Sequence, residues 1–160
     1  MPRFQTLGVL ALCLVCAVGL PCCGTDNPAG LPDVLRAVIR IAVVPNPVEG
    51  SQSPITGTIS AAFTVTVAEL NGLGGELAFI SSTVFDPETG AQVALNYFDD
   101  KDLAVFVGSK RIEPGGSLEI PTTLTYVLPD FRKEANLTVA VQFRDDRGNL
   151  INYSIFVKIV

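Results

Sequence analysis

Two acidic segments carry the side chains best suited to binding a metal ion, because calcium prefers carboxylate and amide oxygens as ligands. They contain Asp99, Asp100 and Asp102 in one segment and Asp145, Asp146 and Asn149 in the other. If both segments are loops at one end of the fold, they could hold a calcium ion between them. However, Lys101 and Arg147 lie among these acids and could neutralise them. We expect two turns exposed to solvent and keep calcium binding as the alternative.

Residue types that usually carry catalysis are scarce. The chain has no His, and its four Cys are Cys13, Cys16, Cys22 and Cys23. The sequence after Cys23 therefore has no Ser-His-Asp triad, thiol nucleophile, thiolate metal site or disulfide. A Ser–Lys or paired-carboxylate mechanism is possible in principle, but the serines fall on alternating strand positions or in turns. We predict that the protein is not an enzyme, and we assign no catalytic, cofactor-binding or metal-binding residues and no cofactor.

Phosphate and nucleic-acid binding are also disfavoured. Gly72, Gly74 and Gly75 follow a predicted strand, but another strand follows them where a phosphate-binding loop needs a helix. The net charge is −5, whereas nucleic-acid binding requires clustered Lys and Arg that neutralise phosphates. We therefore expect no nucleic-acid partner.

An uncharged run at residues 7–20 (LGVLALCLVCAVGL) follows Arg3. Its 14 residues are fewer than the roughly 20 that span a bilayer, but they fit the central region of a secretory signal. The segment ends in GLPCCGTDNPAGLPD, which resembles a bacterial lipoprotein signal. This resemblance implies cleavage before a Cys that carries diacylglycerol. Cys23 has the usual Leu three residues before it, at Leu20, but Cys22 stands directly before it, where the pattern usually has a small residue. Cys22 directly follows Pro21, which is unfavourable next to a cleavage site. We predict lipidation at Cys23, with Cys22 as the second candidate and simple secretion as the alternative.

These features divide the chain into three parts. Residues 1–23 are predicted to be a signal peptide, residues 24–33 a flexible tether rich in Gly, Pro, Asn and Asp, and residues 34–160 one domain.

Alternating hydrophobicity predicts strands throughout this domain. In residues 59–67 the odd positions are Ile, Ala, Phe, Val and Val, and the even positions are mostly Ser and Thr. Pro121 indicates an edge strand or a bulge, and we expect almost no helix. The aromatic residues fall mostly on positions that alternation assigns to the interior. The predicted strands are residues 35–44, 59–67, 77–85, 91–97, 103–107, 118–128, 137–144 and 151–159.

The segments VVPNPVEG, TISAAFTVTVAELNGLGG, RIEPGGSLEIPTTLTY and ANLTVAVQFRDDRGNLINYSIFVKI resemble bacterial extracellular immunoglobulin-like modules, including the cell-adhesion-related group. The similarity covers residues 35–160. The chain lacks the Cys…Trp…Cys core of antibody-type domains, so this resemblance implies an architecture and no specific family. It predicts an all-β fold, an Ig-like antiparallel β-sandwich of about 7–8 strands.

Export signal and fold together predict a non-catalytic, secreted or surface-anchored binding or structural module of the cell envelope. Its partner would be a protein or a carbohydrate, and the lipid would attach it to a membrane. Inward-facing aromatics count against carbohydrate. The alternative is an accessory subunit of an envelope assembly that docks by adding a strand to an exposed sheet edge.

Overall fold

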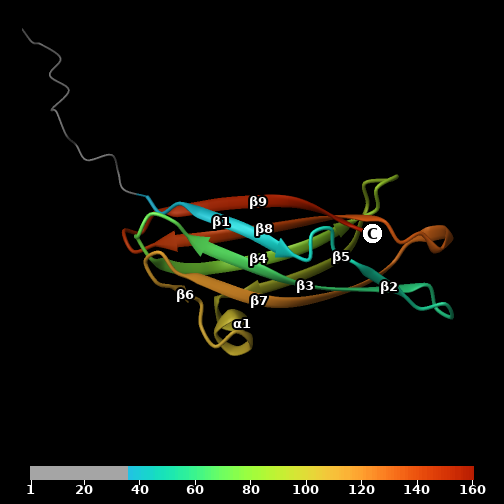
Figure 1. Cartoon of the computed structure of the whole chain (residues 1–160), viewed down its shortest axis with the longest axis horizontal. Coiled ribbons are helices and arrows are strands. Elements are labelled where there is room, and N and C mark those ends of the chain that lie inside the picture. Colours follow the sequence, from blue (N-terminus) through green and yellow to red (C-terminus); the bar gives the residue numbers. More distant parts are fainter. Residues whose placement is uncertain (1–35) are drawn as a thin grey trace, which may run out of the picture. The chain divides into compact units, whose positions relative to one another are not determined.

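The computed structural model describes residues 36–160, and these form an all-β fold with two antiparallel sheets (Figure 1). Inward-facing side chains of both sheets join one hydrophobic core. One helix and one short 3-10 helix interrupt the strands. In chain order the elements are β1 (Ile39–Val44), β2 (Gly50–Gln52), β3 (Thr58–Glu69), β4 (Gly75–Phe85), β5 (Gln92–Asp99), α1 (Asp100–Phe106), β6 (Arg111–Ile112), β7 (Ser117–Val127), η1 (Pro129–Phe131), β8 (Ala135–Asp145) and β9 (Leu150–Ile159).

The first sheet is built around β3. Strand β7 pairs with β3 along Thr58–Ala68, so β1 and β2 both lie on the other side of β3. The alternation in β3 buries Ile59, Phe63 and Val65 and leaves the intervening residues half-buried or exposed. Pro121 lies in β7, an edge strand of this sheet, as its missing N–H predicted.

The second sheet has the strand order β5-β4-β8-β9, and the short β6 pairs with the start of β4. Strand β4 is central, in agreement with its apolar residues on both faces. The predicted inward positions of β8 are confirmed, because Val139, Val141 and Phe143 are all buried. A β-bulge between Leu77 and Phe79 shifts the alternation of β4 by one residue.

The connection between β1 and β2 links the two sheets. Val48 forms a parallel bridge with Ile159 at the end of β9. Its N–H donates to the carbonyl of Lys158 at 2.9 Å, and its carbonyl accepts from the N–H of Val160 at 2.9 Å. Strand β1 is therefore hydrogen-bonded to β3 in one sheet, and the segment that follows it is hydrogen-bonded to β9 in the other.

A buried carboxylate closes one end of the first sheet. Glu69, the last residue of β3, is buried, and its side chain accepts four backbone N–H groups. Oε1 accepts from Asn71 at 3.0 Å, and Oε2 accepts from Gly72, Leu73 and Gly115 at 2.8, 3.1 and 2.8 Å. Burial acts to raise the pKa of Glu69, but these hydrogen bonds outweigh it and lower the pKa. Glu69 thus joins the β3–β4 loop to the turn before β7.

The strand predicted at residues 103–107 is wrong, because this segment lies in α1. Asp99 caps the helix by accepting from the N–H of Lys101 and Asp102 at 2.8 and 2.9 Å. The Asp102 side chain accepts the N–H of Asp99 in return, completing a capping box. Leu103 is buried, while Val105, which alternation placed on the same face, is 79% exposed. The capping box at its start therefore makes this segment a helix instead of a strand.

The short strands β2 and β6 were not predicted, since two or three residues carry no measurable periodicity. Among the residues described, no helix is long and apolar enough to cross a membrane.

Candidate functional site

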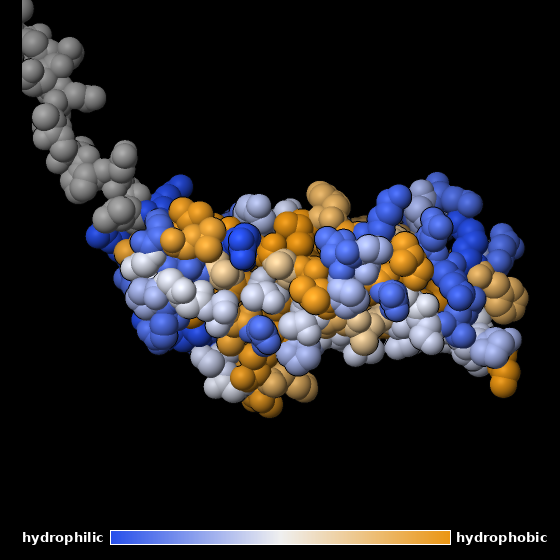
Figure 2. Space-filling model, viewed as in Figure 1, coloured by the Kyte–Doolittle hydropathy of each residue, from blue (hydrophilic) through white to orange (hydrophobic). Residues whose placement is uncertain are grey.

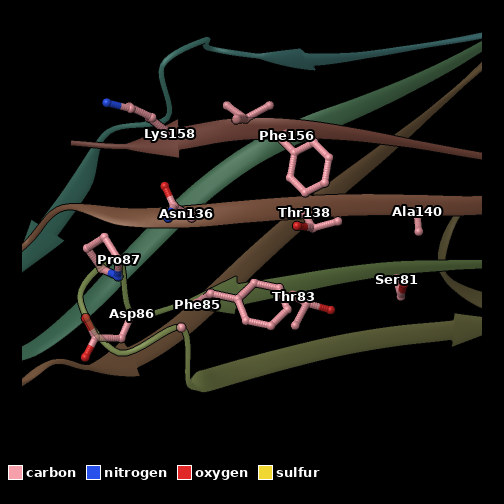
Figure 3. Close-up of a pocket in the computed structure, with 12 residues that line it drawn as sticks. Ser81, Thr83, Phe85, Asp86, Pro87, Asn136, Thr138, Ala140, Phe156 and Lys158 are labelled. Atoms are coloured by element: carbon pink, nitrogen blue, oxygen red, sulfur yellow. The ribbon is translucent and has the colours of Figure 1, made fainter.

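A hollow lies on the outer face of the second sheet. It has a volume of about 690 Å³, within the range of small-molecule sites. Figure 3 shows how strands β4, β8 and β9 and the β4–β5 turn contribute its walls. Its lining residues are Ser81, Thr83, Phe85, Asp86, Pro87, Gly90, Asn136, Thr138, Ala140, Phe156, Val157 and Lys158. We call this hollow the outer groove.

Strand register arranges the outward side chains in four rows that cross the sheet. Each row takes one residue from each strand, because partners in an antiparallel ladder lie side by side. In the order β9, β8, β4, β5 the rows are Lys158–Asn136–Phe85–Gln92, Phe156–Thr138–Thr83–Leu95, Ser154–Ala140–Ser81–Tyr97 and Asn152–Gln142–Phe79–Asp99.

Aromatic rings stand over a floor of small side chains in these rows. In Figure 3, the rings of Phe156 and Phe85 lie on either side of Thr138. Phe156 is 81% exposed, which is unusual for a ring on a strand. Beyond the groove, Phe79 and Tyr97 stack with ring centroids 5.6 Å apart, and Tyr97 is 51% exposed. A smaller hollow of about 220 Å³ that includes Phe79 adjoins the outer groove at Ala140.

The exposed rings overturn the expectation that the aromatics point inward. Phe63, Tyr126 and Phe143 are buried, but Tyr97, Phe106, Phe131, Tyr153 and Phe156 are exposed. A signal was present in the sequence, because Phe156 alternates in register with the polar residues Asn152, Ser154 and Lys158.

A salt-bridged carboxylate forms one end of the outer groove. Asp86 is buried, and it accepts the N–H of Glu88 at 2.9 Å and the hydroxyl of Thr89 at 3.0 Å. Arg132 lies 3.3 Å from Asp86 and also pairs with Glu88 at 2.8 Å. The hydrogen bond from the Glu88 backbone, followed by those from Thr89 and Arg132, lowers the pKa of Asp86 against the opposing effect of burial. Asp86 is therefore ionised at neutral pH but satisfied within the protein.

The acidic segments weighed as a calcium site use their carboxylates elsewhere. Asp99 and Asp102 form the capping box of α1. Asp145 is buried and closes the β8–β9 turn, accepting the N–H groups of Ala37, Arg147 and Asn149 and the side-chain amide of Asn149. Burial acts to raise the pKa of Asp145, but these hydrogen bonds lower it.

The remaining acids of both segments pair with neighbouring cations. Lys110 lies 3.2 Å from Glu76 and 3.3 Å from Asp100. Arg111 donates to both carboxylate oxygens of Asp146, at 2.9 and 3.1 Å. These pairs bring the two acidic segments to one end of the sheet, but as ion pairs. Within residues 36–160, no three acidic, His or Cys side chains are grouped to hold a metal ion.

The outer groove offers groups that can hydrogen-bond a ligand. The groove presents the hydroxyls of Ser81, Thr83 and Thr138 with no His beside them. The predicted lipidation sites Cys23 and Cys22, together with the rest of the signal peptide and the tether, lie outside the described residues.

No family model and no curated protein matches this chain. Two solved structures resemble it in fold. Northeast Structural Genomics Consortium target SoR45 has a TM-score of 0.57 and 15% identity, covering 75% of this chain and 84% of its own. A protein from Bordetella pertussis, target BeR40, has a TM-score of 0.56 and 9% identity, covering 76% of this chain and 93% of its own. At these identities the likeness concerns the fold alone.

Proposed function

We propose that this chain is an exported, non-catalytic binding module, held at the cell envelope by a lipid on Cys23, with Cys22 as the second candidate. The observation that carries the binding role is the outer groove, where Phe156 remains 81% exposed beside a hollow of about 690 Å³. Monomeric proteins seldom leave large rings uncovered together without a partner. The export signal supports the location, and the absence of His and of any Cys after Cys23 supports a role without catalysis.

We further propose that the two sheets form an Ig-like sandwich. In that fold a sheet containing strands A, B and E packs on a sheet containing C, F and G. Here β3 lies between the β1–β2 edge and β7, while β4 and β8 lie between β5 and β9. This order matches A-B-E and C′-C-F-G. The parallel bridge from Val48 to β9 supports the same assignment, since it places the segment after the first strand beside the last strand.

Intact-mass spectrometry of the full-length protein, produced in bacteria and extracted from membranes, tests the anchoring. We expect a lipid mass on the wild type and on Cys22→Ser, and none on Cys23→Ser. Loss of the lipid mass only with Cys22→Ser would move the site by one residue. A soluble, unmodified product from the wild-type chain would refute lipidation and leave a simply secreted module.

The second candidate is an envelope subunit that docks through a sheet edge, and β5 favours it. Among residues 36–160, only β4 pairs with β5, and residues 92–98 contain neither a charge nor a Pro that would block strand addition. If this role holds, Asn96→Lys should release a stoichiometric envelope protein that copurifies with the wild type, without changing the melting temperature. The Phe156→Ala variant should retain that protein, because Phe156 lies on β9, away from this edge.

A further inference from the structure

The chemistry of the outer groove narrows the class of ligand, on the basis of the binding role proposed above. Apolar side chains and hydroxyls alternate across the groove and the neighbouring strand β5. Phe156 and Leu95 flank the hydroxyls of Thr138 and Thr83 in one row, and Ser81 and Tyr97 share the next. Phe156 lies on β9 and Tyr97 on β5, three strand spacings apart, so about 14 Å of sheet separates the two strands. The face is long enough for a chain of several linked units.

The middle of this face carries no formal charge. The two central rows, from Phe156 to Leu95 and from Ser154 to Tyr97, contain no ionisable group except the Tyr97 phenol. Cationic side chains appear only at the ends, at Lys158 and Arg144, and Asp86 is neutralised by Arg132. Figure 2, coloured by hydropathy, shows mostly hydrophilic residues at both ends of the described domain and a mixture with many hydrophobic ones along its middle. The complementary ligand is therefore uncharged.

We propose that the outer face of the second sheet binds a neutral polysaccharide chain running across the Phe156 and Tyr97 rings. A sugar ring has an apolar C–H face and a hydroxyl-bearing rim. The C–H face packs on an aromatic ring, whose π-electrons attract the slightly positive hydrogens. The rim hydroxyls exchange hydrogen bonds with the side chains of Ser81, Thr83, Thr138 and Asn136, which otherwise face solvent.

Other polymers fit this face less well. Single-stranded nucleic acid also stacks on aromatic rings, but it requires a cationic groove along its backbone, and the central rows have no cation. A protein partner favours a contiguous apolar core that excludes water. Here hydroxyl-bearing Thr83 and Thr138 separate Phe156 from Leu95, so the apolar groups are interrupted at the centre of the face.

Titration calorimetry of the mature full-length protein, extracted in detergent, tests the proposal. The probes are neutral hexasaccharides (cellohexaose, xylohexaose, mannohexaose and chitohexaose) and acidic hexagalacturonate. We expect at least one neutral probe to bind and the acidic one to bind more weakly. Phe156→Ala and Tyr97→Ala should each weaken neutral binding by about tenfold, the effect of losing one stacking ring. The matched control Phe131→Ala removes a ring that is 65% exposed but outside the groove, so it should bind as the wild type does.

Absence of binding by every neutral probe would overturn the proposal, as would unchanged affinity in the Phe156→Ala, Tyr97→Ala double variant. A second measurement separates this failure from failure of the binding role. With p-benzoylphenylalanine in place of Phe156, irradiation of intact cells that crosslinks a single protein would refute the polysaccharide and leave the binding module standing. Crosslinking to purified cell-wall polysaccharide, abolished by competing free hexasaccharide, would support it.

Discussion

Replacing Glu69 by Gln tests whether the buried carboxylate, rather than the hydrophobic core alone, holds the end of the first sheet. The change keeps the shape of the side chain but removes its charge. If the amide oxygen takes the place of Oε2, it keeps the bonds from Gly72, Leu73 and Gly115, now in weaker neutral form. The amide nitrogen then faces the N–H of Asn71, and two donors meet with no acceptor.

The expected loss is about 2 kcal/mol of unfolding free energy at pH 7. One backbone donor left without its partner costs about 1–3 kcal/mol, and the weakening of three charged hydrogen bonds adds to this loss. Relief from burying a charge offsets part of it. For a domain of this size, the melting temperature should fall by about 6–10 °C.

The same carboxylate predicts a pH dependence with a definite sign. The folded-state pKa of Glu69 lies below its ordinary value of 4.5, so folding favours the ionised form. Its stabilisation is therefore complete above about pH 4.5 and is lost as the pH falls through the folded-state pKa. The difference in stability between wild type and Glu69→Gln should shrink correspondingly in acid.

Urea unfolding followed by circular dichroism at a series of pH values measures both effects. Glu119→Gln is the matched control, because Glu119 is also on a strand of the first sheet but is exposed. It should leave stability within about 0.5 kcal/mol of wild type. A Glu69→Gln variant as stable as the control at pH 7, or one whose deficit persists unchanged at low pH, would refute the role assigned to the carboxylate.

Three further predictions concern the hydrophobic core, a close contact between strands and the lack of a disulfide in the domain. Phe143→Ala should cost about 3–5 kcal/mol in urea unfolding, because Phe143 is fully buried, and a loss below about 1 kcal/mol would contradict its inward position. Gly75→Ala should cost about 1–3 kcal/mol, since a Cβ there would overlap the Arg144 carbonyl and the Phe143 ring; an unchanged melting temperature would show that the strands separate freely. Reductant should leave the melting temperature of the mature protein unchanged, because no Cys follows Cys23, and a shift would reveal a disulfide that stabilises the domain.

The sequence alone determined the position of strands that bury one face and turn the other toward solvent. In β3 and β8, apolar residues at every second position identified the buried face, and Val65, Val139 and Phe143 lie there. The missing N–H of Pro121 predicted an edge strand or a bulge, and Pro121 lies on an edge strand. Alternation identifies the buried face because it is a local property: the side-chain direction of a strand repeats every two residues whatever the strand pairs with.

Alternation misled where local geometry departs from an ideal strand. The bulge beside Ala78 moves Phe79 from the face of Leu77 to the opposite face, so counting from Leu77 places this ring in the core. In residues 103–107, apolar residues at every second position suggested a strand. The capping box formed by Asp99 and Asp102 instead starts a helix there.

Only the tertiary structure decided the candidate site, because its residues come from strands distant in the sequence. Phe79 and Tyr97 stack since β4 and β5 pair in one register, and Phe156 joins the groove since β9 pairs with β8 rather than with β4. Pairing likewise places Asp146 beside Arg111, which donates to both of its carboxylate oxygens. Hydrophobic periodicity specifies which way a side chain points, whereas strand order and register specify its neighbours, and these depend on the packing of the whole domain.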